Sequence, residues 1–379
     1  MTLTVQSLWG FSTPAMDEVF SAERIVDGML RFERGLALGL AEVGIAPRPE
    51  AEAIAVACET PVDDPGAVLA TTWENGTPLI ALVELVKSRL ESDEERRWVH
   101  HGATTQDVVD SAYMVLSRRA LDLLDQGLVN VAMRMKELVE AYRDQPHMAR
   151  TFLQDAQPTT FGLRVAGWLE PLLSQIETLR GLRSTLALQL GGPVGNLSSY
   201  GADGMAVVQA VAAQLELAAP AAPWHTDRSR IRSLADAVVG PVDTLAKVAM
   251  DVSLLTSSTI GEVTARHGGS SSMPDKQNPV DSIRVLAGAD LCRGAVAMVV
   301  HARPHELDRA LGAWHMEWVA LPLIFQSASA VIEAAGTLLA TLEIDRAAMS
   351  ARAGDTTPAY DPALIDSVLG HHERVMGGA

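Results

Sequence analysis

The sequence of 379 residues has little positive charge, cysteine or aromatic side chain. Thirty Lys and Arg stand against 47 Asp and Glu, and the net charge of −17 argues against nucleic acid as a partner, although a local basic site for a small anion stays open. Its two cysteines, Cys58 and Cys292, offer neither a disulfide framework nor a metal-ligand spacing, so we expect a reducing compartment. There is no basic leader and no uninterrupted run of about 18 apolar residues, which predicts a cytoplasmic protein with no membrane partner.

Apolar residues make up 48% of the chain but aromatic residues only 4%, so the core must be aliphatic, as is typical of packed helices. Apolar positions spaced by three or four predict a helix over residues 231–255, about 36 Å long at about 1.5 Å per residue, which suits a bundle. Alternating stretches of the β type are scarce. Similar helical stripes cover residues 112–142, 169–186, 280–300 and 318–342.

We therefore predict an all-α chain built around a long central helical bundle. Pro-punctuated short helices precede the bundle, and a polar segment of mixed character follows it. The predicted division is an N-terminal helical domain over residues 1–108, the central long-helix bundle over 109–342 and a shortened C-terminal segment over 343–379.

Residues 268–279 form a segment of glycines and hydroxyl side chains between two predicted helices. Lys276 adds a cation, and Asn278 followed by proline has the residue types of a helix start. Backbone amides and hydroxyls can bind an oxyanion, and a serine near a cation can act as a base because its alkoxide is stabilised. A flexible linker that ends in a helix cap is the alternative.

Two adjacent histidines, His100 and His101, precede a pair of threonines in residues 98–107. No HxxE or HExxH spacing accompanies them, so we expect no metal there. Residues 150–160 place further polar groups between two long helices, and the alternative interpretation is that a threonine serves as a helix cap. In residues 223–230, the acidic side chain of Asp227 fits an ordinary first helical turn.

These four segments, in this order among long helices, resemble the fumarase/aspartase superfamily. Residues 269–279 match its signature, Gly-Ser-Ser-x-Met-Pro-x-Lys-x-Asn-Pro, at every fixed position. The motifs His-Gly-Ala-Thr-Thr-Gln-Asp and Gln-Pro-Thr-Thr-Phe-Gly are most similar to its muconate cycloisomerase branch, which is close to adenylosuccinate lyase. The resemblance extends from the N-terminus to about residue 342.

The resemblance implies a homotetramer in which each active site combines segments of three subunits. It implies a small di- or tricarboxylate substrate and no metal or organic cofactor. The implied chemistry is proton transfer next to a carboxylate through an aci-carboxylate, with a β-substituent that leaves or adds. In the cycloisomerase branch the substituent is an internal carboxylate, which closes a lactone from 3-carboxy-cis,cis-muconate.

Matched position by position, the resemblance assigns Ser270 as the general base. Relatives have a histidine at the position of Phe152 or of Asp155, and this chain has neither. The general acid is therefore left open between Asp155, His100, His101 and water. The residues that the resemblance assigns to substrate binding are Thr104, Thr105, Thr151, Gln154, Arg228, Ser271, Lys276 and Asn278.

The missing histidine favours a lactonising enzyme over one that releases an amine, because a carboxylate needs no protonation to attack or to leave. Trp318 stands where adenylosuccinate lyases tend to have arginine, which argues against a nucleotide substrate. One alternative is a β-elimination lyase that releases a stable anion such as nitrite, or an amine, from a substituted succinate. Another is a non-catalytic helical assembly protein, against which the intact Ser270, Lys276 and Asn278 argue.

Overall fold

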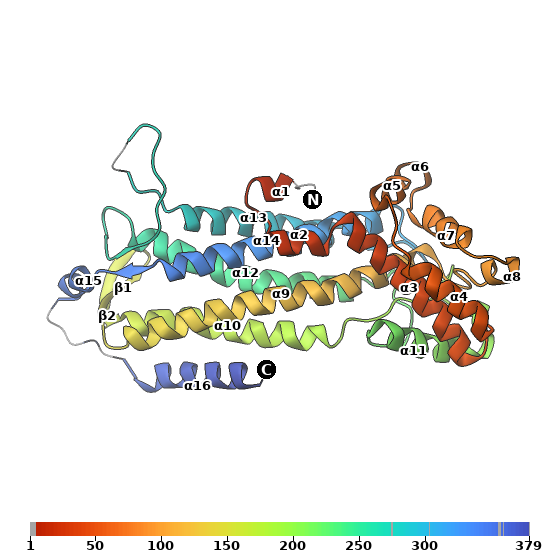
Figure 1. Cartoon of the computed structure of the whole chain (residues 1–379). Helices are drawn as coiled ribbons and strands as arrows, with labels where there is room; N and C mark the ends of the chain where they lie inside the picture. The colour runs from red at the N-terminus through yellow and green to blue at the C-terminus, as the bar shows by residue number, and fades with distance from the viewer. Residues whose placement is uncertain (1–4, 274–275, 303, 355–357, 359, 379) are drawn as a thin grey trace.

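The computed structural model describes residues 5–273, 276–302, 304–354, 358 and 360–378. Pro274 and Asp275 of the segment 268–279 lie outside these ranges. The described chain is predominantly helical, which confirms the predicted fold class. It forms an elongated bundle with a group of shorter helices at one end (Figure 1).

Five long helices build the bundle where the apolar stripes predict them. They are α9 (Thr105–Ala141), α10 (Phe161–Arg183), α12 (Ser229–Leu255), α13 (Val280–His301) and α14 (Ala313–Ala340). Within α12 the predicted stripe is buried along its whole length, from Ile231 to Leu255. The helices α13 and α14 pack along each other, as do α9 and α10 (Figure 1). A threonine does act as a cap: Thr160 accepts a hydrogen bond from the Leu163 N–H at 3.2 Å at the start of α10.

From residue 5 onward, where the description of the chain begins, eight helices precede the bundle: α1 (Val5–Leu8), α2 (Pro14–Val19), α3 (Ala22–Val43), α4 (Arg48–Glu59), α5 (Pro65–Ala70), α6 (Thr72–Asn75), α7 (Leu79–Ser88) and α8 (Asp93–Arg96). A later segment, with the 3-10 helix η1 (Ser198–Asp203) and α11 (Gly204–Leu215), returns to this end, and α11 packs against α3. One hydrophobic core continues through all these parts. The division at residues 108 and 342 therefore stays a prediction.

The opposite end of the bundle has a β-hairpin that the sequence reading did not predict. Its strands, β1 (Pro146–Thr151) and β2 (Gln154–Thr160), are antiparallel, and Thr151 pairs with Gln154 across a two-residue turn. A second short pair, β3 (Val263–Thr264) and β4 (Glu343–Ile344), lies beyond α12. The C-terminal segment then packs α15 (Arg346–Ala353) against the hairpin and returns α16 (Ala363–Gly377) along α10 (Figure 1).

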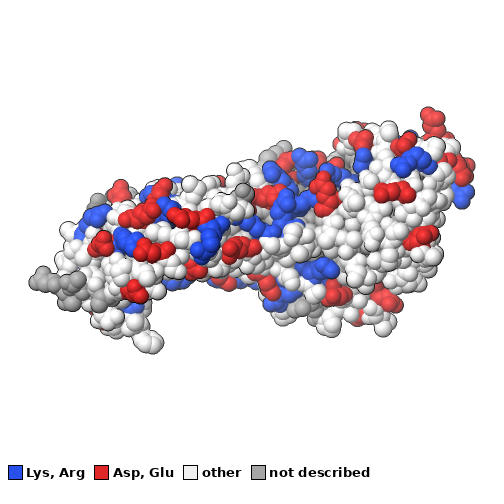
Figure 2. Space-filling view, turned by 90° about the horizontal axis from the view of Figure 1, so that it is seen from below, with Lys and Arg blue, Asp and Glu red and all other residues white. Residues whose placement is uncertain are grey.

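The surface and the longest apolar helix bear on possible partners. On the face seen in Figure 2, basic side chains are interleaved with acidic ones rather than gathered into one basic surface. Among the described residues, α14 alone is long and apolar enough to cross a membrane, and most of its apolar stretch is buried in the protein, as in a core helix.

Candidate active site

The predicted site residues lie at both ends of the bundle within one chain. The histidine and threonine segment immediately precedes and begins α9, whereas the hairpin with Thr151, Gln154 and Asp155 follows the far end of that helix (Figure 1). The 37 residues of α9 span about 54 Å at about 1.5 Å per residue. A small carboxylate cannot contact both groups in a single chain.

A buried carboxylate organises the first group. Asp107, in the first turn of α9, is fully buried and accepts hydrogen bonds from the backbone N–H groups of Gly191 and Gly192, each at 2.9 Å, and of Thr104 at 3.0 Å. Its Oδ1 also lies 2.7 Å from Nε2 of His225. Asp107 therefore fastens the start of α9 to two later segments and holds Thr104 in place beside the helix end.

The two adjacent histidines have different environments. Nδ1 of His100 lies 2.7 Å from Oε1 of Glu33 on α3. Burial lowers the pKa of His100, but the charge of Glu33 and its hydrogen bond raise that pKa overall. The ring of His101 packs against Trp98 at 4.8 Å between ring centres, and burial, followed by the charge of Arg97, lowers its pKa. His100 is thus the better candidate for a charged imidazole.

Arg228 lies inside the bundle rather than on an open wall. Only 2% of the residue is exposed, and its guanidinium donates to Asp110 of α9 at 2.7 Å and to Glu317 of α14 at 3.1 Å. The indole of Trp314 donates to the same Asp110 at 2.9 Å. In the single chain these contacts make Arg228 a link between three helices, and its contact with substrate stays a prediction.

At the hairpin, the predicted residues flank a strained turn. Phe152 and Leu153 have left-handed backbones, with φ of 49° and 63°, and the Phe152 side chain is 98% exposed. Thr151 and Gln154 adjoin this turn and are exposed as well. The hairpin therefore presents both predicted substrate-binding groups outward from the end of the bundle.

Asp155 is held between two arginines. Its carboxylate lies 3.1 Å from Nε of Arg150 and 3.4 Å from Nη1 of Arg352, which comes from α15. Arg150 also pairs with the buried Glu262, and although burial raises the pKa of Glu262, hydrogen bonds from His147 and Arg150 lower it to about 2. Asp155 is therefore already engaged by two guanidinium groups of its own chain.

The signature segment folds back on itself at the same end of the bundle as the hairpin (Figure 1). Gly268 and Asn278 exchange two backbone hydrogen bonds, at 2.9 and 3.1 Å, and close the segment into a loop. Oγ of Ser270 accepts N–H groups from Ser272 at 3.3 Å and from Met273 at 3.0 Å. Such donors stabilise a serine alkoxide, as a general base requires.

The remaining predicted groups of this loop are open to solvent. Ser271 and Lys276 are exposed, and the ammonium group of Lys276 has no partner among the described residues. Nδ2 of Asn278 donates to the carbonyl oxygen of Gly269 at 3.0 Å. Over the described ranges, no three His, Cys, Asp or Glu side chains come together as metal ligands.

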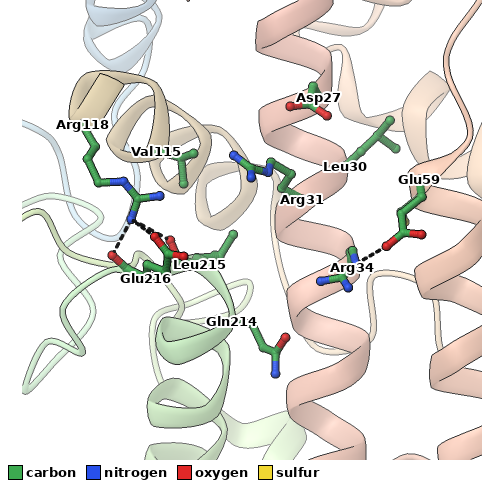
Figure 3. A pocket seen from close by; sticks show the side chains of 11 residues that line it. Asp27, Leu30, Arg31, Arg34, Glu59, Val115, Arg118, Gln214, Leu215 and Glu216 are labelled. Carbon is green, nitrogen blue, oxygen red and sulfur yellow. Dashed lines mark hydrogen bonds and ion pairs between the residues drawn. The ribbon is translucent and has the colours of Figure 1, made fainter. Parts of the chain in front are cut away.

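Two cavities differ in their relation to these residues. One of about 490 Å³ lies beside the hairpin, and Gln154 and Asp155 line it. Another, of about 450 Å³, lies between α3, α9 and α11 and contains none of the predicted residues (Figure 3). The charges of two of its arginines are compensated within the cavity, because Arg34 pairs with Glu59 at 2.8 Å and Arg118 pairs with Glu216 at 3.1 Å. The other two charged lining residues, Asp27 and Arg31, add one charge of each sign.

Comparison with known proteins identifies the family. A family profile described as "Lyase" matches residues 10–289. The chain is 38% identical to the 3-carboxy-cis,cis-muconate cycloisomerase of Pseudomonas aeruginosa over 353 residues, which are 91% of this chain and 77% of the relative. The chain belongs to the fumarase/aspartase superfamily of lyases.

A solved structure shares the fold of this chain, and a further relative has a different named activity. The 3-carboxy-cis,cis-muconate lactonizing enzyme of Pseudomonas putida superposes with a TM-score of 0.84 at 34% identity, and the match covers 92% of this chain and 79% of that one. The nitrosuccinate lyase of Streptomyces davaonensis is 31% identical over 90% of this chain and 76% of the relative.

Sequence motifs did not reveal the roles of Glu33, Asp107 and Glu262, which are among the buried carboxylates behind the site segments. Glu33 had a usable signal, because it interrupts an otherwise apolar buried face of α3. Asp107 ends the motif His-Gly-Ala-Thr-Thr-Gln-Asp, but its role depends on Gly191, Gly192 and His225, which are distant in sequence. No local pattern pointed to Glu262.

Proposed function

We propose that this superfamily member is a cycloisomerase that converts 3-carboxy-cis,cis-muconate to its carboxymuconolactone. The observation that carries the proposal is the pairing of Asp155 with Arg150 and Arg352, at a position where the superfamily resemblance implies a histidine. A side chain held by two arginines at this position takes the place of the histidine that would protonate an amine leaving group. A carboxylate nucleophile requires none. The similarity to named cycloisomerases supports the same activity.

In the lactonising direction, one carboxylate oxygen of the substrate attacks the β-carbon of a double bond conjugated to another carboxylate. The C–O bond forms as the double-bond electrons move into that second carboxylate, which becomes an aci-carboxylate. The Ser270 hydroxyl then gives its proton to the α-carbon, and the N–H groups of Ser272 and Met273 stabilise the alkoxide until it regains a proton from water. One carboxylate becomes a neutral ester, so the reaction takes up one proton.

The remaining predicted groups would bind the three carboxylates of the substrate. Lys276 and Asn278 bind the carboxylate at which negative charge grows, with Ser271 beside them, and Thr104 and Thr105 bind a second. Further polar contacts come from Thr151, Gln154 and Arg228. His100 and His101 adjoin the threonine pair. No metal or organic cofactor takes part in this scheme.

Because these groups are separated by about the length of α9, the proposed site requires more than one copy of the chain. We propose a homotetramer whose active sites combine segments of different subunits, in the cytoplasm and without nucleic acid or membrane partners. The outward-facing hairpin, with its exposed Phe152, supports an assembly in which the hairpin packs against another copy.

The test is to mix purified protein with freshly generated 3-carboxy-cis,cis-muconate and follow the loss of the diene absorbance. We expect rapid loss with the wild-type chain, and a decrease of several orders of magnitude for Ser270→Ala with the oligomer intact. Unchanged turnover in Ser270→Ala would reject Ser270 as the group that transfers the proton. If the wild-type protein leaves the diene intact but releases nitrite from nitrosuccinate, the chain is the alternative anion-releasing lyase.

A further inference from the structure

We propose that Glu33 is a positioning residue of the active site, which holds His100 as an imidazolium for binding a substrate carboxylate. The inference rests on the proposed function and assigns a source of positive charge beside Thr104 and Thr105. Glu33 belongs to no motif of the sequence, and it comes from α3, outside the segments matched to the superfamily site.

The carboxylate of Glu33 has very few hydrogen-bond partners. Only 1% of the residue is exposed, and its Oε1 lies 2.7 Å from Nδ1 of His100. Its Oε2 is buried without a hydrogen-bond partner among the described residues. A buried carboxylate is costly unless a charged donor accompanies it. His100 is the only group that donates to it within the described chain, so the pair is most stable with His100 protonated.

His100 is held in a defined orientation. Its backbone is left-handed, with φ of 57°, and the neighbouring carbonyl oxygen of His101 accepts a hydrogen bond from the Tyr200 hydroxyl at 3.0 Å. The His100 side chain is 21% exposed, and its Nε2 has no hydrogen-bond partner within the described ranges. With Nδ1 committed to Glu33, Nε2 is the nitrogen left for a ligand.

The other titratable groups around Glu33 and His100 do not reverse the raised pKa of His100. From α9, Asp107 also raises the pKa of His100, whereas Lys87 on α7 lowers it. Burial raises the pKa of Cys58 on α4 and of Tyr200, so the thiol and the phenol stay neutral near Glu33. Glu33 is therefore the charge in direct contact that determines the protonation of His100.

The decisive variant is Glu33→Gln, which keeps the size of the side chain and removes its charge. His100 should then lose its proton at lower pH. The high-pH decrease of kcat/KM should shift to lower pH, with an effect of about tenfold at pH 8, a smaller one at pH 6, and most of the change in KM. Glu170→Gln is the matched control, because Glu170 makes the same contact with His371 at 2.9 Å on the distant α16.

A double variant separates positioning from folding. Glu33→Gln should have no further effect on kcat/KM in a His100→Gln background, because Glu33 acts through His100. The inference is overturned if Glu33→Gln leaves the pH profile in place, lowers activity equally at every pH, or adds its full effect to His100→Gln. A merely structural role would change thermal stability and oligomer yield without moving the profile.

A measurement on the wild-type protein covers the case in which Glu33→Gln does not fold. Histidine-labelled protein is titrated by NMR, with the His100 ring signals assigned by their loss in His100→Gln. We expect His100 to titrate above the ordinary histidine range with Nδ1 protonated throughout, and titration at or below that range would reject the inference. This readout does not need turnover, so loss of the proposed cycloisomerase activity is distinguished from failure of the Glu33 assignment.

Discussion

Replacing Arg228 with methionine should destabilise the protein by about 3–5 kcal/mol at pH 7, because it leaves two buried carboxylates without their cation. The magnitude follows from the contacts: Asp110 and Glu317 are both buried, and the guanidinium between them is the one charged donor that bonds to both among the described residues. Methionine has a similar length and fills the space, so the loss is electrostatic rather than a cavity.

The same variant should also change the pH dependence of stability. Burial raises the pKa of Glu317 although Arg228 opposes this, so removing Arg228 raises that pKa further. A carboxyl whose folded pKa is raised takes up a proton in the folded state first, and the folded state gains stability as the pH falls toward that pKa. The deficit of Arg228→Met should therefore become smaller between pH 7 and pH 5.

The assay is the urea midpoint followed by circular dichroism at one fixed protein concentration, at both pH values. Arg293→Met is the matched control, because Arg293 pairs with Asp243 and Asp290 at 2.8 and 2.9 Å but has a side chain 44% exposed. An exposed pair of this kind contributes at most about 1 kcal/mol. Equal midpoints for the two variants at pH 7 would refute the reasoning.

Two further predictions follow from the geometry of the site segments. Gly102→Ala should lower the thermal midpoint more than Gly44→Ala. Both glycines are left-handed, with φ of 76° at Gly102 and 85° at Gly44. A Cβ at Gly102 would lie 2.6 Å from Cε1 of Tyr200, whereas a Cβ at Gly44 would meet open space. Gly44→Ala should lower the free energy of unfolding by only about 1–2 kcal/mol, because its one cost is the strain of a left-handed alanine. Equal midpoints for the two variants would show that the Tyr200 contact is unimportant. Ser270→Ala and Thr105→Val, each inactive alone, should regain diene-consuming activity when unfolded and refolded together; no recovery would mean that each site lies within one copy.

The long helices could be predicted because helical periodicity is a local property of the sequence. The stripe from Ile231 to Leu255 needed no knowledge of its neighbours, and all of it is buried. The β-hairpin could not be predicted in the same way. Its turn uses Phe152 and Leu153 in left-handed conformations, where glycine or asparagine would have given a recognisable signal.

The site was only partly predictable, for a related reason. Motifs located Ser270, the threonine pair and the hairpin residues, but their partners are distant along the chain. Glu33 lies 67 residues from His100, and Arg352 lies 197 residues from Asp155. The raised pKa of His100 and the ion pairs of Asp155 depend on these long-range contacts, which no local spacing contains.

The contacts of Asp107 have a consequence for how the chain folds. Its donors at Gln189, Gly191, Gly192 and His225 follow it by 82 to 118 residues. When synthesis of α9 is complete, the chain contains Asp107 but none of these four donors. The start of α9 therefore stays hydrated until residue 225 has left the ribosome. Closing the longer of these loops adds only about 0.3 kcal/mol of entropy over the shorter, so all four contacts can form in one cooperative step. This end of the molecule should close late and determine the folding rate.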